Sequence, residues 1–300
     1  MQLLFSLSRD QELTYKEAEK RYWEVIDSTF NLYLYNIYVV QSITALAEVA
    51  EANKKSKHLP TEQDKLFSAK LYQNELIQNL VENAKLQKKF STLNFEAISN
   101  KDYFKKIYDG FAKTEEYLAY LAKESDNKAH LDIILELYRY CRKDEFFNEL
   151  MEDNFANWID DKSVVVGTFK KSVKVLPASD PKFYEVHFPD EETIKDFGSV
   201  LLKYTHKEDE ELLKIIKPSL KNWDHERLAV LDMIVLKMAI TELIHFPTIP
   251  TKVTLNEFVE VSKMYSTAKS KDFINGVLDK LMKDLVEEGK VKKEGRGLVD

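Results

Sequence analysis

Few side chains in this sequence are spaced as the groups of an active site. The six histidines are scattered, and none forms an H-E-x-x-H pair or another metal-ligand spacing. The glycines are isolated, so neither a G-x-G-x-x-G loop nor a Walker A loop is present to hold a phosphate. A G-x-S-x-G nucleophile elbow is also missing. The acidic runs Asp160-Asp161 and Glu208–Glu211 are typical of helix N-termini, where the macrodipole favours negative charge. We therefore expect no enzymatic activity, no metal site and no cofactor.

The composition is that of a globular protein with one large or two medium-sized domains. The chain has 300 residues, of which 44% are hydrophobic and 32% charged. A net charge of −7 argues against phosphate binding by the whole surface, but it is compatible with a local nucleic-acid site. The lone Cys141 excludes an intramolecular disulfide and fits a reducing compartment. The apolar run Phe30–Val40 is too short to span a membrane, and Met1–Ser8 lacks the basic start of a signal peptide. We expect a cytoplasmic protein.

Helical patterns dominate the chain, and we predict an all-α fold built from helical bundles. Seven glycines and seven prolines leave little material for tight β-turns. Thr14-x-x-Glu17 has the pattern of a capping box, and it opens a helix expected to reach about Lys55. The strand-like runs Val164–Val166 and Tyr184–Phe188 are short. Further helices are expected over residues 61–90, 101–123, 131–141, 146–151, 157–175, 191–203 and 208–217.

The most distinctive stretch is 222–281, which predicts three helices. The first covers Asp224–Phe246 and ends before Pro247, because proline cannot continue a helix. The second runs from about Lys252 to Tyr265, and the third covers Ser270–Glu288. Gly276 lies inside the third, where glycine costs about 1 kcal/mol relative to alanine. We expect a neighbouring helix or a ligand to approach closely there.

Four phrases in this stretch carry a resemblance to a known family. They are W-x-x-E-R-L at Trp223–Leu228, E-L at Glu242-Leu243, I-P-T-K-V-x-L-N-E at Ile249–Glu257 and S-K-x-F-I-N-G-V-L-D-K at Ser270–Lys280. In this order they resemble the C-terminal half of the NusB family of transcription antitermination factors. Met1–Ser6 resembles the later half of that family's first helix, and Asp196–Leu202 loosely resembles a following helix. The whole sequence looks like the long form of this family that is found in Bacteroidetes-type bacteria.

The resemblance implies a domain organisation. Residues 1–12 would be the remnant of the first family helix, and 191–288 would form the NusB-like helical domain. Between them we expect a long helical insertion over 13–176 and a linker over 177–190, where Asp180-Pro181 indicates a turn. The glycine-containing end, 289–300, is expected to be disordered.

The resemblance also implies partners. Family members bind boxA-type single-stranded RNA together with ribosomal protein S10 (NusE), in the elongation complex with RNA polymerase on ribosomal RNA operons. Asp232 and Phe5 fall at positions that contact S10, whereas RNA contacts fall at Glu226, Tyr265, Lys269 and Phe273. Tyr265 and Phe273 would stack on unpaired bases, worth about 1–3 kcal/mol each, and Lys269 would neutralise a phosphate. Phe273 also begins the inward row of the last helix, so a role in the core is the alternative.

Two departures from the family pattern concern RNA binding. The family's arginine-rich start has no counterpart before Met1–Ser6, which implies either a start codon further upstream or a reduced affinity for RNA. Asp272 stands where relatives often have a basic residue. The alternative function is therefore a helical protein–protein interaction scaffold that has lost or weakened RNA binding.

Overall fold

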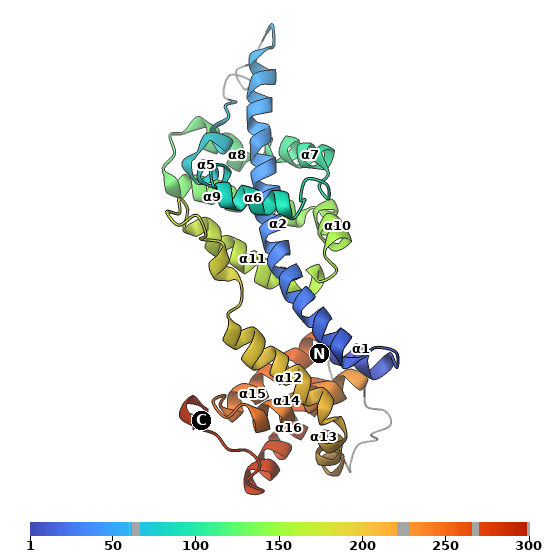
Figure 1. The fold of residues 1–300 in the computed structure, drawn as a ribbon. Coiled ribbons are helices and arrows are strands. Elements are labelled where there is room, and N and C mark those ends of the chain that lie inside the picture. Colours follow the sequence, from blue (N-terminus) through green and yellow to red (C-terminus); the bar gives the residue numbers. More distant parts are fainter. Residues whose placement is uncertain (60, 62–66, 221–228, 266–269, 299–300) are drawn as a thin grey trace. The chain divides into compact units, whose positions relative to one another are not determined.

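The computed structural model describes residues 1–59, 61, 67–220, 229–265 and 270–298. Throughout these ranges the chain forms helices and no strand, which confirms the predicted all-α class (Figure 1). The chain forms two compact units: unit 1 combines Met1–Glu24 with Pro189–Asp300, and unit 2 consists of Val25–Phe188.

The long helix α2 (Tyr15–Lys55) begins in unit 1 and continues into unit 2. Its start has the predicted capping box. The backbone N–H of Thr14 donates to Glu17 Oε2 at 2.9 Å, and the N–H of Glu17 donates to Thr14 Oγ1 at 3.3 Å. These two reciprocal bonds satisfy backbone donors that a helix start otherwise leaves unpaired.

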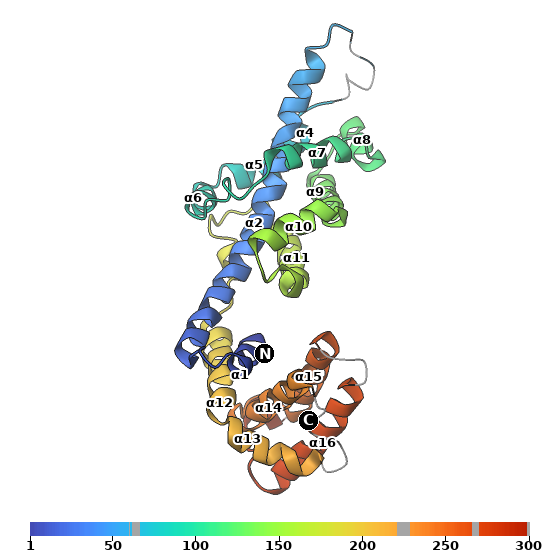
Figure 2. The same cartoon turned by 90° about the vertical axis from the view of Figure 1, so that its right-hand side faces the viewer.

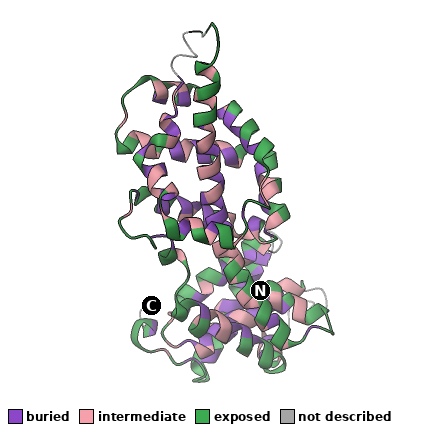
Figure 3. Cartoon of the chain, turned by 45° about the horizontal axis from the view of Figure 1, so that its top comes forward, coloured by how far each residue is buried: buried purple, intermediate pink, exposed green. Residues whose placement is uncertain are grey.

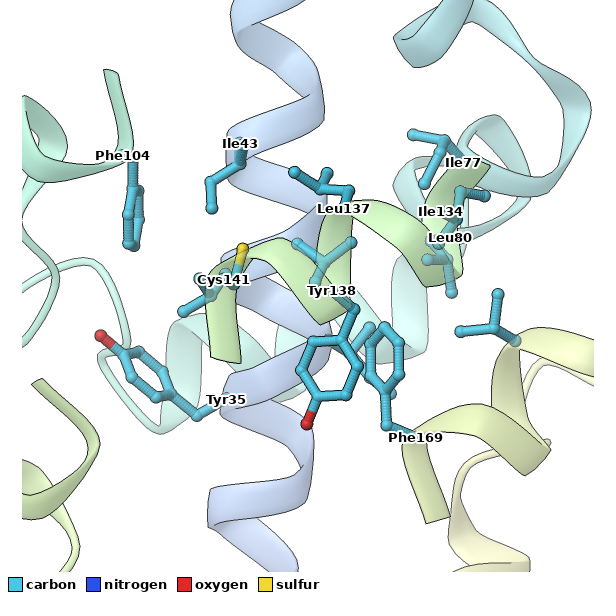
Figure 4. Close-up of a cluster of buried hydrophobic side chains, with 14 of the residues drawn as sticks. Tyr35, Ile43, Ile77, Leu80, Phe104, Ile134, Leu137, Tyr138, Cys141 and Phe169 are labelled. Atoms are coloured by element: carbon cyan, nitrogen blue, oxygen red, sulfur yellow. The ribbon is translucent and has the colours of Figure 1, made fainter. Parts of the chain in front are cut away.

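Unit 2 is built around the buried part of α2 (Figure 1). Buried side chains of α2 between Leu32 and Ala47 form one hydrophobic core with side chains from the other helices of the unit (Figure 4). Those helices are α4 (Lys70–Gln73), α5 (Glu75–Val81), α6 (Ala84–Thr92), α7 (Lys101–Phe111), α8 (Glu115–Ala122), α9 (Asn127–Lys143), α10 (Glu145–Asn154) and α11 (Trp158–Lys174).

One polar pair lies inside this core. Asn36 and Tyr138 are both fully buried, and the Tyr138 hydroxyl donates to Asn36 Oδ1 at 2.9 Å. The Asn36 amide in turn donates to the carbonyl of Leu32 at 2.8 Å. Cys141 is also fully buried, and burial raises the pKa of its thiol. Its thiolate is therefore scarce and the side chain acts as a small apolar group.

Two predicted helices are broken in the structure. The helix expected over 61–90 is replaced, in its described part, by α4, α5 and α6, and the one over 101–123 is divided into α7 and α8. The side chains of Asn74, Asn83 and Thr114 accept hydrogen bonds from the backbone at the starts of α5, α6 and α8. Each is an N-cap, whose extended backbone interrupts a helix. In agreement with the all-α prediction, neither strand-like run forms a strand: Val164–Val166 lies within α11, and Tyr184–Phe188 surrounds the 3₁₀ turn η1 (Glu185–His187).

The segment expected to be a linker packs against unit 2. Phe183 and Tyr184 are buried. Asn79 makes two hydrogen bonds with the backbone of Ala178, donating to its carbonyl at 3.2 Å and accepting from its N–H at 3.0 Å. The segment up to Phe188 thus belongs to the core that it follows.

Unit 1 is built around α14 (Val230–His245), as Figure 2 shows. This helix is apolar on nearly all sides. A helix of this kind has to be covered all round. The covering elements in the described part of the unit are α1 (Gln2–Arg9), α12 (Val200–Lys207), α13 (Asp209–Ile216), α15 (Thr251–Tyr265) and α16 (Ser270–Glu287). The π-helix η2 (Glu192–Ser199) leads into α12, and the 3₁₀ turn η3 (Lys217–Leu220) follows α13. Burial alternates accordingly, with inner faces buried and outer faces exposed (Figure 3).

Residues 15–22 and residues 289–298 both pack against other parts of unit 1. The Tyr22 hydroxyl donates to the carbonyl of Ile194 at 2.7 Å, and the ring of Tyr15 stacks on His206 at 5.3 Å. Residues 289–298 differ from the expected disorder. Val291 is buried, the N–H of Glu294 donates to the carbonyl of Pro247 at 3.0 Å, and Gly295–Leu298 forms the 3₁₀ turn η5.

Candidate RNA-binding and partner-binding site

The predicted RNA face lies where α15 ends and α16 begins. The two helices pack against each other and against α14. Buried side chains of α15 recur at helical spacing, from Thr254 through Phe258 to Ser262, and those of α16 recur from Phe273 through Val277 to Leu285. These rows hold both helices to the core. The core therefore fixes the end of α15 at Tyr265 and the start of α16 at Ser270, which come before and after residues 266–269 in the sequence.

The end of α15 presents an amphipathic surface. Met264 is 67% exposed and Tyr265 is half-buried, while the exposed Lys263 forms an ion pair with Glu260. At the start of α16, Lys271 and Asp272 are both exposed. The two helix ends thus carry a half-buried tyrosine and exposed lysines, the groups needed to stack on a base and to neutralise a phosphate.

Phe273 lies in the core of unit 1. Its side chain is only 8% exposed and packs in the same cluster as Ile274, Val277 and the buried side chains of α14. This is the alternative that the sequence left open for Phe273. Its ring is covered in this structure, so it supports the start of α16 rather than offering a face to a base.

Asp232 is placed inside the protein. It is 4% exposed, and its Oδ2 accepts a hydrogen bond from Ser270 Oγ at 2.9 Å. This bond connects the first turn of α14 with the first residue of α16. No sequence pattern predicts this pairing, since the two residues are far apart in the chain. A direct contact of Asp232 with a partner would require this buried carboxylate to become exposed.

Phe5 lies on the surface, on α1. Its side chain is 37% exposed, and the Arg9 guanidinium lies over its ring at 5.9 Å from the centroid. The preceding residue, Leu4, is buried against Leu202 and Ile234. Packing of Leu4 thereby fixes α1 and leaves the Phe5 ring accessible to a partner protein.

The remaining predicted site residues lie outside the described residues. These are Glu226, with the W-x-x-E-R-L phrase that contains it, and Lys269. The structure thus brings Tyr265, Phe273 and Asp232 to one end of the α14–α15–α16 bundle, since the bond of Ser270 to Asp232 joins the start of α16 to the start of α14, and α15 ends just before α16. Phe5 is on α1, which packs on α14 and α12.

Glu242 is a buried carboxylate that sequence reasoning did not single out as a site. It is 4% exposed on α14, within the E-L phrase. Burial raises the pKa of Glu242, against the opposing effects of a hydrogen bond with Thr254 and of the nearby Lys293 ammonium. The same burial lowers the pKa of Lys293, whose ammonium also donates to the carbonyl of Phe246 at 3.0 Å. Glu242 therefore connects α14 to α15 and to the C-terminal segment. A charged residue within an apolar helix was the available signal.

The expectation for Gly276 is wrong as far as a neighbouring helix is concerned. A Cβ at this position would meet no atom within 4 Å, and the residue is exposed. The described parts of the chain also hold no group of His, Cys, Asp and Glu side chains arranged to bind a metal ion. Within the same parts, every helix is too short or too polar to cross a membrane.

Comparisons with known proteins match this part of the chain. The model of the NusB family matches residues 172–283. A transcription antitermination protein NusB from Salinibacter ruber is 40% identical over 114 residues, which are 38% of this chain and 71% of that protein. A protein of the same name from Thermodesulfovibrio yellowstonii is 36% identical over 104 residues, or 34% of this chain and 69% of that protein.

A third NusB, from Chloroherpeton thalassium, is 42% identical over 79 residues, which are 26% of this chain and 37% of that protein. No solved structure matches the chain at a comparable level of significance. The first two relatives are matched over more than two thirds of their length at well above 30% identity. By its sequence and by its all-α bundle around α14, the chain belongs to the NusB family.

Proposed function

We propose that this chain is a transcription antitermination factor that binds boxA-type single-stranded RNA together with ribosomal protein S10 on ribosomal RNA operons. In this role it acts without catalysis, in the cytoplasm, as part of the elongation complex with RNA polymerase. The observation that carries the proposal is the 40% identity to a transcription antitermination protein NusB, of which 71% is covered.

The RNA contact is assigned to the end of α15 and the start of α16. Tyr265 is the stacking residue, because its half-buried ring is fixed by the protein and still partly accessible. Lys269 contacts a phosphate, and Glu226 accepts hydrogen bonds from a base. Phe273 holds the start of α16 in place from within the core.

The S10 contact is assigned to α1, through the exposed ring of Phe5. Asp232 acts on this surface indirectly, since its bond to Ser270 fixes the end of the bundle at which α14 starts. Protein and RNA thus bind to unit 1, and neither contact involves unit 2.

Fluorescence anisotropy with a labelled boxA RNA, with and without S10, tests the RNA contact. Tyr265→Ala should weaken RNA binding by about 5- to 150-fold, the equivalent of one lost stacking contact, whereas Tyr265→Phe should retain it. Lys269→Ala should reduce the slope of log K against log salt by about 0.7. Lys280→Ala is the matched control, because Lys280 is exposed further along α16. Equal affinity of the Tyr265→Ala variant and the unmodified chain would refute the assignment.

Binding of S10 is tested separately by a pull-down with purified S10. Phe5→Ala should weaken the complex, and Val286→Ala, which removes a 47% exposed side chain from α16, should not. If the unmodified chain binds neither S10 nor boxA RNA, the proposed function is wrong.

A further inference from the structure

A groove runs between two neighbouring helices of unit 2, outside the NusB-like bundle. It has a volume of about 370 Å³ and is formed by α8, α9 and the short connection between them. The two helices are labelled in Figure 2 and pack against each other. From α8 and the residue that follows it, the groove is lined by Glu116, Ala119, Tyr120 and Lys123, which recur at spacings of three and four. From α9 it is lined by Ala129, Asp132, Ile133 and Glu136, at the same spacings. Each helix therefore contributes one continuous face. Ala119 and Ala129 leave the groove open, because longer side chains at these two positions would fill it.

The floor of the groove is held in place by hydrogen bonds. The Tyr120 hydroxyl and His130 Nδ1 lie 2.8 Å apart, which joins α8 to α9. The Lys70 ammonium donates to the carbonyl of Tyr120 at 2.6 Å and also to that of Lys123. These bonds satisfy carbonyls that the end of α8 leaves unpaired. Ile133, which is 5% exposed, supplies apolar floor. The groove is therefore formed before any ligand arrives, and its volume lies within the range of ligand pockets, about 300–1,000 Å³.

The rim is strongly acidic. Glu116, Glu124, Asp132 and Glu136 line the groove together with a single cation, Lys123. Glu136 is paired with Arg139 at 2.7 Å. Within the described residues, Glu116 and Asp132 have no ion-pair partner, although both are exposed. Carboxylates on both sides of an apolar groove repel the phosphates of RNA and attract lysine and arginine.

We propose that this α8–α9 groove binds a basic peptide segment of a partner protein, which inserts one apolar side chain between Ala119 and Ala129 and places cationic side chains beside Glu116 and Asp132. Charge complementarity selects the segment, and the apolar side chain gives it a fixed position. The groove lies entirely in unit 2, so it shares no residue with the surfaces assigned to RNA and S10 on unit 1.

A displayed library of short random peptides, selected on the immobilised full chain, tests this proposal. The enriched peptides should carry lysine or arginine around a Leu, Met or aromatic residue. Their affinities are then measured by fluorescence anisotropy against the full chain and against two variants. Ala119→Leu fills the groove, and Glu116→Lys combined with Asp132→Lys reverses its charge. Each should weaken binding by about tenfold or more.

The matched control is Glu115→Lys combined with Glu145→Lys, which changes the net charge equally at exposed positions that do not line the groove. It should leave the affinity within about twofold. Circular dichroism establishes that every variant is folded. The proposal is overturned if no peptide is enriched, if the enriched peptides are neutral or acidic, or if they bind both groove variants as tightly as the unmodified chain. Full displacement by spermidine, which has charge but no apolar anchor, would also overturn it. None of these results depends on RNA or S10 binding.

Discussion

The buried pair of Asn36 and Tyr138 allows a quantitative test of the core of unit 2. Both side chains are fully buried, and the Tyr138 hydroxyl has Asn36 Oδ1 as its acceptor. Tyr138→Phe leaves that oxygen without its tyrosine donor, and Asn36→Leu leaves the hydroxyl without its acceptor. A buried polar group without a partner costs about 1–3 kcal/mol, whereas removal of both partners can be nearly neutral. Each single variant should therefore lose about 2 kcal/mol of unfolding free energy, and the double variant no more than either one.

The assay is urea unfolding followed by the fluorescence of Trp158, which is buried in unit 2. Replacing the other two tryptophans by phenylalanine makes this signal specific to the unit, which matters because a chain of two units need not unfold in one step. At an m value of about 2 kcal/mol per molar urea, a loss of 2 kcal/mol lowers the midpoint by about 1 M. Tyr140→Phe, on the same helix and without a hydroxyl hydrogen bond among the described residues, is the control and should change the midpoint little. If the two single losses simply add in the double variant, the two side chains do not interact and the reasoning is refuted.

Two further predictions concern unit 1. Gly276→Ala should raise its unfolding free energy by about 1 kcal/mol, because alanine favours the helix and its methyl group meets no atom within 4 Å; a lower urea midpoint would show that a side chain does not fit there. Glu242 has its pKa raised by burial, so its contribution to stability is complete below its unfolded pKa and is lost as pH rises through the folded pKa. Glu242→Gln should therefore stabilise unit 1 more at pH 7 than at a pH near the pKa of Glu242 in the unfolded chain. Urea unfolding at the two pH values compares the effects, and an equal effect at both would contradict a raised pKa.

Local patterns predicted individual helices better than their junctions. Thr14 and Glu17 formed the expected capping box because both partners are close in sequence. Asn74, Asn83 and Thr114 are N-caps as well. Because they lie between apolar residues at helical spacing, the sequence pattern predicts them on the polar faces of two longer helices. Sequence alone could not distinguish these cases, because the same residue types occur as N-caps and as exposed residues within a helix.

The candidate site was predictable only to the level of its helices. The start of α15 and the start of α16 agree with the expected positions. The burial of Asp232 and its bond to Ser270 depend on how α14 and α16 pack, which no local pattern encodes. One of the two boundaries between the units is a similar case. It falls between Glu24 and Val25, within the uninterrupted helix α2, so no proline, glycine or polar run marks it, whereas the other boundary falls at Pro189, within the predicted linker.

The division of unit 1 into two pieces of sequence has a consequence for synthesis on the ribosome. Met1–Glu24 is translated before unit 2, but it makes contacts with residues beyond Pro189, such as the hydrogen bond of Tyr22 to Ile194 and the ring stacking of Tyr15 on His206. Unit 2 is contiguous and can complete its core as soon as Phe188 has emerged, because domains fold as units during translation. Residues Met1–Glu24 therefore reach their native contacts only after the second piece of unit 1 has been made, and α1 exposes its apolar side, with Leu4, until then.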